Sequence, residues 1–139
     1  MNETNVLLYI PVIGEANEKI QGVIDKVSPD AKREIIETIE DLSRRLCRPV
    51  DRPTIAILAA ENKEDLLNII SIRHLLSEIP IILILPDREE STTAMGYTLW
   101  PRFLTYVDSN SSELVAVLGK MFDKYGKEVM EEWHNIWKS

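Results

Sequence analysis

The sequence predicts an α/β fold of three layers, in which a doubly wound, parallel, five-stranded sheet lies between two layers of helices. Short apolar runs, each long enough for one strand, recur along the chain. Segments with apolar residues at helical spacing separate these runs, which is typical of parallel strands joined by crossover helices. The length of 139 residues is close to that of one ordinary domain, so we expect a single domain over residues 1–139.

Three of the apolar runs are almost unbroken. They cover residues 6–13, 54–60 and 79–85, and they are rich in Ile, Leu and Val. Such runs are typical of strands that are buried on both faces of a parallel sheet. A fourth run, over residues 103–107, is shorter and mixes polar with apolar residues, so we expect a further strand nearer an edge.

Amphipathic helices are expected between these strands. Residues 16–27 carry Ile20, Val23 and Ile24 at the spacing of one helix face. Residues 61–78 repeat the pattern, with Asn62 as the N-cap and a proline just beyond the end. A weaker helix is expected over residues 91–99, where Gly96 is placed to end it in a left-handed conformation.

Residues 30–48 admit two interpretations. Their apolar residues keep the spacing of one continuous helix: Ile35, Ile36, Ile39, Leu42 and Leu46. An open α/β sheet needs a strand here, however, and residues 34–39 can supply a short one before a helix over residues 40–48. We adopt the strand, although the local pattern by itself favours the helix.

The resulting order of elements, with right-handed crossovers, predicts a flavodoxin-like doubly wound sheet. In such sheets the functional crevice lies outside the carboxyl ends of the strands, where the strand order reverses. We therefore expect the residues of any site at that edge.

The C-terminal segment, about residues 112–137, keeps an apolar stripe along its whole length. A single helix of this length would extend about 39 Å at ~1.5 Å per residue, whereas a compact chain of this size has a radius of gyration near ~14 Å. It would then outrun its own domain and offer a surface to a homodimer or to a protein partner. The candidate interface residues are Tyr125, Val129, Trp133, Ile136 and Trp137. The alternative is that Gly126 breaks the helix and a second short helix folds back onto the domain.

Charge and composition exclude several classes of function. The net charge of −7 argues against a nucleic-acid binder, whose affinity comes largely from neutralised phosphates. No apolar run approaches the ~20 residues of a membrane span. We find no metal-ligand spacing and no glycine-rich phosphate loop, so we expect neither a metal nor a cofactor. A single cysteine, Cys47, and a start without a basic leader favour the cytoplasm.

Three stretches together resemble the receiver domains of two-component response regulators, the CheY-like family. They are the run 54–60 that leads into a helix, the Ile79-Pro80 pair that opens the next apolar run, and Gly96 followed by Phe103 and Leu104. The resemblance covers about residues 5–125. It implies the receiver fold and a role in signal transduction.

The resemblance also implies where phosphorylation chemistry would lie. Phosphoryl transfer needs an aspartate nucleophile, carboxylates for Mg²⁺, a hydroxyl and a lysine. Residue by residue, the acidic pair falls on Ile10 and Pro11, the nucleophile on Ala59 or Ala60, the hydroxyl on Leu85, and the lysine on Tyr106 or Val107. None has the required chemistry, so the chain is similar to atypical pseudo-receivers that cannot be phosphorylated.

We therefore expect a non-catalytic signalling or scaffolding module that acts by protein–protein contact, with a partner that the sequence does not identify. The alternative is a small flavodoxin-like enzyme or ligand-binding domain. That alternative would use the carboxylates at the strand ends, Glu61, Asp87 and Asp108. Asp87 also has a plainer role, which is to cap the helix that follows it.

Overall fold

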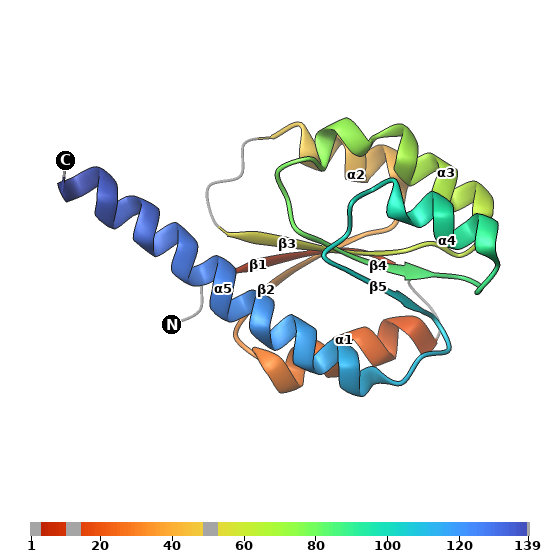
Figure 1. Ribbon diagram of the computed structural model, residues 1–139, viewed down its shortest axis with the longest axis horizontal. Coiled ribbons are helices and arrows are strands. Elements are labelled where there is room, and N and C mark those ends of the chain that lie inside the picture. The colour runs from red at the N-terminus through yellow and green to blue at the C-terminus, as the bar shows by residue number, and fades with distance from the viewer. Residues whose placement is uncertain (1–3, 11–14, 49–52, 139) are drawn as a thin grey trace.

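A computed structural model describes the backbone of residues 4–10, 15–48 and 53–138, together with their side chains other than those of Glu15 and of residues 125–138. One parallel sheet has the strand order β2-β1-β3-β4-β5. Its strands are β1 (Asn5–Tyr9), β2 (Lys32–Ile36), β3 (Thr54–Ala59), β4 (Ile81–Leu85) and β5 (Phe103–Tyr106). The predicted α/β class and the doubly wound, flavodoxin-like order are confirmed (Figure 1).

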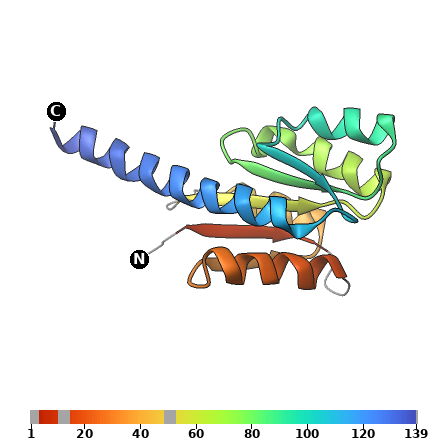
Figure 2. The same cartoon turned by 60° about the horizontal axis from the view of Figure 1, so that its bottom comes forward.

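Helices cover both faces of the sheet, as Figures 1 and 2 show. One face carries α1 (Glu15–Val27) and α5 (Ser111–Lys138). The other carries α2 (Ile39–Leu46), α3 (Lys63–Ser71), a short 3₁₀ helix η1 (Arg73–Leu75), and α4 (Glu90–Tyr97). The three predicted layers are therefore present.

Alternate residues of each central strand supply the two halves of the core. In β1, Val6 and Leu8 pack toward α1 and α5, whereas Leu7 and Tyr9 pack toward α2, α3 and α4. The side chains of all five β1 residues are buried. This burial on both faces explains why the strand is apolar along its length instead of alternating with polar residues.

Residues 30–48 contain a strand followed by a helix, which is the interpretation adopted from the sequence. β2 pairs with β1 in parallel, with Leu7 opposite Glu34. The chain then turns at Thr38, whose hydroxyl accepts a hydrogen bond from the backbone N–H of Asp41 at 3.1 Å and so caps α2. Ile39, the last residue of the predicted strand, begins the helix instead.

The helix predicted over residues 61–78 is shorter than expected. Asn62 is its N-cap, as predicted, but α3 ends at Ser71 and η1 follows it. Eighteen helical residues would extend about 27 Å, whereas a five-residue strand such as β4 spans only about 17 Å. The tighter 3₁₀ turn buries Leu76 and returns the chain to the start of β4.

The prediction that Gly96 ends its helix in a left-handed conformation is wrong. Gly96 lies inside α4 and is buried. A Cβ atom there would lie 3.0 Å from Leu83 Cδ2, 3.1 Å from Leu104 Cδ1 and 3.2 Å from Leu85 Cδ2. The glycine is needed for close packing of α4 on the sheet, and the left-handed residue is Trp100, with φ of 53°.

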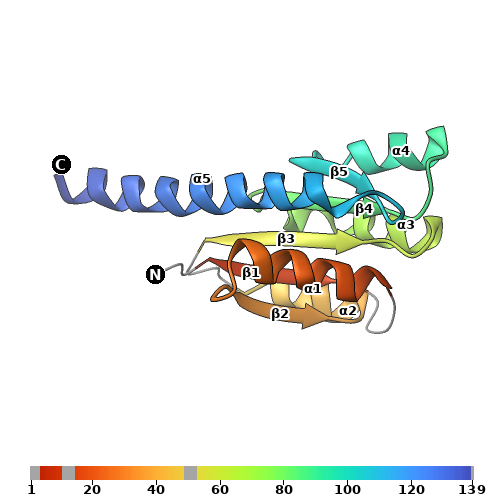
Figure 3. The same ribbon diagram turned by 90° about the horizontal axis from the view of Figure 1, so that it is seen from below.

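The C-terminal segment is one helix, α5, so the predicted alternative of a break at Gly126 is wrong. Its first half packs on α1, where Leu114, Leu118 and Phe122 join the core. Its second half projects past the amino ends of the strands, away from the sheet (Figures 1 and 3). Within the described ranges, no helix has the length and apolarity to cross a lipid bilayer.

Candidate functional site

A hollow of about 270 Å³ lies at the carboxyl ends of β1 and β3. The strand order reverses at this point, because β1 has β2 on one side and β3 on the other. We call it the carboxyl-edge hollow. Its lining consists of Tyr9, Ile10, Glu37, Ala59, Glu61, Asn62, Glu64, Asp65 and Asn68.

Asp65 joins the two strand ends that frame the hollow. Its carboxylate accepts a hydrogen bond from the hydroxyl of Tyr9 at 2.7 Å and another from the backbone N–H of Glu61 at 3.1 Å. The backbone N–H of Asp65 in turn donates to the side chain of Asn62 at 2.8 Å. The loop between β3 and α3 is thus fixed to the end of β1.

The carboxyl-edge hollow is acidic. Glu37, Glu61, Glu64 and Asp65 line it, and no lysine or arginine is among the described residues of its lining. Burial first, and then the hydrogen bond and the negative charge of Asp65, raise the pKa of the Tyr9 hydroxyl well above its usual value. In the part of the chain with described side chains, no three His, Cys, Asp or Glu residues are placed to hold a metal ion.

The positions that the resemblance assigns to phosphorylation chemistry are mostly buried and apolar. Ile10, Ala59 and Leu85 are 3%, 4% and 0% exposed, and Ala60 is also buried. They belong to the two halves of the hydrophobic core. Pro11 lies outside the described residues. Burial in such surroundings disfavours a phosphoryl group, because a buried charge needs partners that these side chains do not offer.

Tyr106 is one of the two residues assigned to the lysine position. A cluster at the ends of β4 and β5 holds its side chain. The guanidinium of Arg88 lies 4.3 Å from the centroid of the Tyr106 ring and pairs with Asp108 at 3.0 Å. The Tyr106 hydroxyl lies 3.1 Å from the hydroxyl of Thr93 on α4. Asp108 is therefore engaged in an exposed ion pair.

The expectation that Asp87 caps α4 is wrong, because the N-cap residue is Glu89 and no side chain makes a cap hydrogen bond there. Asp87 instead stabilises the turn before that helix. Its carboxylate accepts a hydrogen bond from the backbone N–H of Glu89 at 3.0 Å, in the turn that begins α4. This hydrogen bond lowers the pKa of Asp87 below its usual value. Nearby, Lys63 at the start of α3 pairs with Glu89 at 2.6 Å and donates to Ser91 at 2.9 Å.

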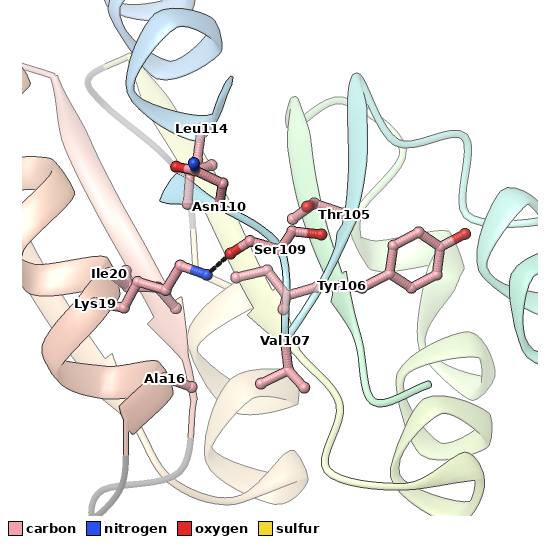
Figure 4. A pocket seen from close by; sticks show the side chains of 10 residues that line it. Ala16, Lys19, Ile20, Thr105, Tyr106, Val107, Ser109, Asn110 and Leu114 are labelled. Atoms are coloured by element: carbon pink, nitrogen blue, oxygen red, sulfur yellow. Dashed lines mark hydrogen bonds between the residues drawn. The ribbon is translucent and has the colours of Figure 1, made fainter. Parts of the chain in front are cut away.

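A second depression at the same edge lies between α1 and the loop after β5 (Figure 4). The ammonium group of Lys19 donates to the backbone carbonyl of Ser109 across it. Its volume of about 10 Å³ is only enough for a single water molecule. It therefore offers no room for a substrate or cofactor.

The three carboxylates of the alternative hypothesis are not brought together in one hollow. Glu61 lines the carboxyl-edge hollow, whereas Asp87 and Asp108 are absent from its lining. The candidate interface residues, Tyr125, Val129, Trp133, Ile136 and Trp137, belong to the described backbone of α5, but their side chains lie outside the described part.

The pairing of Tyr9 with Asp65 and the cluster around Arg88 were not expected from the sequence. A partial signal for the first was present, because Asn62 and Asp65 have the spacing of a helix-capping pair. Nothing local indicated that Tyr9, 56 positions away along the chain, would reach Asp65.

No family model matches this sequence, and no curated protein matches it either. Solved structures do resemble it. A CheY-like response regulator receiver domain from Methanospirillum hungatei has a TM-score of 0.64 at 8% identity and covers 92% of this chain and 99% of its own. A CheY-like response regulator from Mesorhizobium loti has a TM-score of 0.63 at 18% identity and covers 87% and 99%.

A third structure is a response regulator from Burkholderia pseudomallei with a phosphorylated aspartic acid, a calcium ion and citrate. Its TM-score is 0.56 at 11% identity, and the match covers 98% of this chain and 82% of that one. At these identities the likeness establishes a shared fold, which is the fold that the receiver resemblance implied.

Proposed function

We propose that this chain is a non-catalytic signalling or scaffolding module that acts by protein–protein contact and does not accept a phosphoryl group. The observation that carries the proposal is the end of β3. A phosphorylated receiver such as the Burkholderia relative holds its phosphoryl group on an aspartate. Here β3 ends in Ala59, which is buried and has no carboxylate.

Other described residues at the same edge support the proposal. Ile10 and Leu85 occupy positions where Mg²⁺ ligands and a hydroxyl would be needed, and Arg88 is occupied by Asp108 and Tyr106. Glu61 is the nearest carboxylate along the chain to the end of β3, but it is exposed. A nucleophile without a metal and a balancing cation gives little phosphoryl transfer, because this reaction depends on positioning and charge stabilisation.

The surface of the domain, and first that of α5, is therefore where a protein contact is expected. The second half of this helix projects beyond the sheet, and its sequence retains an apolar stripe. A large apolar patch on a protein surface is expected to meet another protein or a second copy. We propose that this half mediates self-association, with Tyr125, Val129, Trp133, Ile136 and Trp137 at the contact.

The phosphorylation part of the proposal is tested by incubating the intact chain with acetyl phosphate and Mg²⁺ and measuring its intact mass. We expect no Mg²⁺-dependent adduct, whereas a phosphorylatable receiver treated in parallel gains one phosphoryl group. Rapid labelling of a carboxylate in this chain would overturn the proposal, and mapping of the adduct would show whether Glu61 is the acceptor.

The self-association part is tested by sedimentation of the full chain and of a variant that stops after Tyr125. This variant keeps every core residue of α5 whose side chain the structure describes, the last of which is Phe122. We expect the full chain to associate as its concentration rises and the shorter one to associate less. Equal, monomeric masses for both at high concentration would exclude a contact through this half of α5.

A further inference from the structure

A large depression lies at the opposite edge of the sheet from the carboxyl-edge hollow. It has a volume of about 1260 Å³ and lies between η1, the end of α4 and the starts of β4 and β5. We call it the amino-edge groove. The residues of its lining that matter here are Arg73, His74, Glu78, Tyr97, Trp100 and Arg102.

Trp100 is the most unusual residue of the amino-edge groove. Its side chain is 88% exposed, and its backbone adopts φ of 53°. The left-handed conformation that ends a helix usually belongs to glycine or asparagine, because a Cβ atom is strained there. The fold would therefore be more stable with a glycine at this position. Tryptophan is also the residue most enriched where proteins bind one another.

The surroundings of Trp100 define what could bind there. Tyr97, one helical turn earlier, is 60% exposed and extends the aromatic surface. Among the residues that the structure describes, Arg73, His74 and Arg102 line the groove with one acidic residue, Glu78. In a chain with a net charge of −7, this is a local excess of basic groups beside exposed aromatic rings. These groups favour an acidic occupant over a basic one.

The chain itself carries a matching acidic surface. The described lining of the carboxyl-edge hollow has four carboxylates and no lysine or arginine, and Glu37, Glu61 and Glu64 are exposed. Because all five strands are parallel, the hollow and the groove lie at opposite edges of the sheet. A second copy placed in the same orientation against the amino edge of the first would present its hollow to the groove.

We propose that copies of this chain associate head to tail, with the amino-edge groove of one against the carboxyl-edge hollow of the next. Such a contact joins two different surfaces, so it can continue from copy to copy instead of stopping at a dimer. Exposed ion pairs are individually weak. Trp100 and Tyr97 therefore anchor the contact, and the charges select its orientation.

The proposed contact is compatible with the direction of α5. The second half of α5 projects past the amino ends of the strands, which is the edge that bears the groove (Figure 3). A copy docked at this edge would lie beside that helix. The inference rests on the proposed function as a protein-contact module, but it uses a different surface from the α5 contact.

Two charge-reversal variants of the full chain test the proposal. The first carries Arg73→Glu and His74→Glu, and the second carries Glu61→Lys and Glu64→Lys. All four side chains are exposed, so each variant should keep the fold, which circular dichroism checks. In the first, both surfaces are acidic. In the second, the hollow carries two lysines beside Glu37 and Asp65, and the groove keeps its basic groups. Each variant alone should therefore fail to associate head to tail. A mixture of the two variants should associate.

Sedimentation velocity over a range of concentrations gives the readout. For the wild type we expect an average mass that rises beyond that of a dimer and falls in high salt, because screening weakens the charge contacts. Each variant alone should stop at the species that α5 supports, and an equimolar mixture should regain the larger assemblies. A wild type that never exceeds a dimer, or a mixture no larger than its components, would overturn the proposal.

Trp100→Gly separates association from folding. We expect this variant to weaken head-to-tail association at least about tenfold, as loss of a central aromatic contact does, and to unfold at a temperature no lower than that of the wild type. Unchanged association would overturn the role of Trp100. The variant that stops after Tyr125 keeps both the groove and the hollow. If that variant loses only the dimer, the loss concerns the α5 contact and not the head-to-tail contact.

Discussion

Tyr9 ends β1 with a side chain that is only 7% exposed and a hydroxyl that donates to Asp65 across the carboxyl-edge hollow. A single hydroxyl thus joins the first strand to the start of α3. Elsewhere along this edge the side chains are tied by ion pairs between exposed groups, which contribute little to stability. Removal of the Tyr9 hydroxyl oxygen should therefore cause a measurable change in the free energy of unfolding.

Tyr9→Phe should lower the free energy of unfolding by about 1 to 2 kcal/mol, since the hydrogen bond has a charged acceptor. Asp65 keeps its hydrogen bond from Glu61, which limits the loss. Urea unfolding at neutral pH measures the change. Tyr97→Phe is the matched control, because Tyr97 is exposed, and it should change stability by less than about 0.5 kcal/mol.

The same residue predicts how stability depends on alkaline pH. The pKa of Tyr9 is raised in the folded state above its usual value of 10.0. Above that value the unfolded chain loses the proton that the folded chain keeps, so stability is fully present below about pH 10 and falls as pH rises further. We expect the free energy of unfolding to fall by about 1.4 kcal/mol per pH unit more steeply in the wild type than in Tyr9→Phe. Parallel slopes above pH 10 would contradict this.

Gly96 allows α4 to lie directly on the side chains of β4 and β5. Gly96→Leu should lower the free energy of unfolding by about 1 to 3 kcal/mol, because its side chain would overlap Leu83, Leu85 and Leu104. The control is the same substitution at Gly22 in α1, where no atom lies within 4 Å of the added Cβ. Gly22→Leu should instead raise stability by somewhat less than ~1 kcal/mol through helix propensity. Thermal unfolding of both variants shows whether the signs are opposite.

At the scale of elements, the start of α3 depends on one side chain. Asn62 accepts the hydrogen bond that would otherwise be missing at the backbone N–H of Asp65. Asn62→Ala should cost about 1 kcal/mol of stability. Asn68→Ala lies on an exposed position of the same helix, where alanine is the better helix former, so it should cause no loss. Equal losses in the two variants would show that the cap contributes nothing.

The two halves of α5 differ in what holds them. The first half is part of the core through Leu114, Leu118 and Phe122. The second half continues the helix without a sheet beneath it, and isolated helices of about 12 to 15 residues are only marginally stable in water. A contact with another chain is therefore the expected source of its stability, and this is the physical reason to test self-association there first.

At the scale of the whole molecule, the carboxyl edge should not respond to divalent metal. The described residues place no three ligands together, and the receiver-type ligand position that the structure describes holds Ile10. We expect the unfolding temperature in about 10 mM MgCl₂ to equal that in NaCl of the same ionic strength. Binding of Mg²⁺ to the folded state would raise the unfolding temperature. A rise specific to Mg²⁺ would indicate a cation in the acidic hollow and would weaken the case against phosphorylation.

The sequence by itself determined the features that depend on near neighbours. Apolar runs gave the central strands, because residues buried on both faces leave an unbroken pattern. Capping chemistry placed the start of α3 at Asn62. The stripe in residues 112–137 predicted helix, but it left open whether one helix outruns the domain or a break at Gly126 lets a second helix fold back. The apolar character of Ile10, Ala59 and Leu85 was also visible without a structure.

The tertiary structure decided what depends on residues far apart in the chain. Residues 32–36 form a strand because β1 offers an edge to pair with, although their own periodicity favours a helix. α3 ends early because the sheet beneath it is short, and Gly96 is explained by leucines of β4 and β5 and not by a turn. The carboxyl-edge hollow and the exposed Trp100 likewise exist only once the strands are aligned. Local periodicity reports which face of a segment is apolar, but long-range packing decides what that face meets.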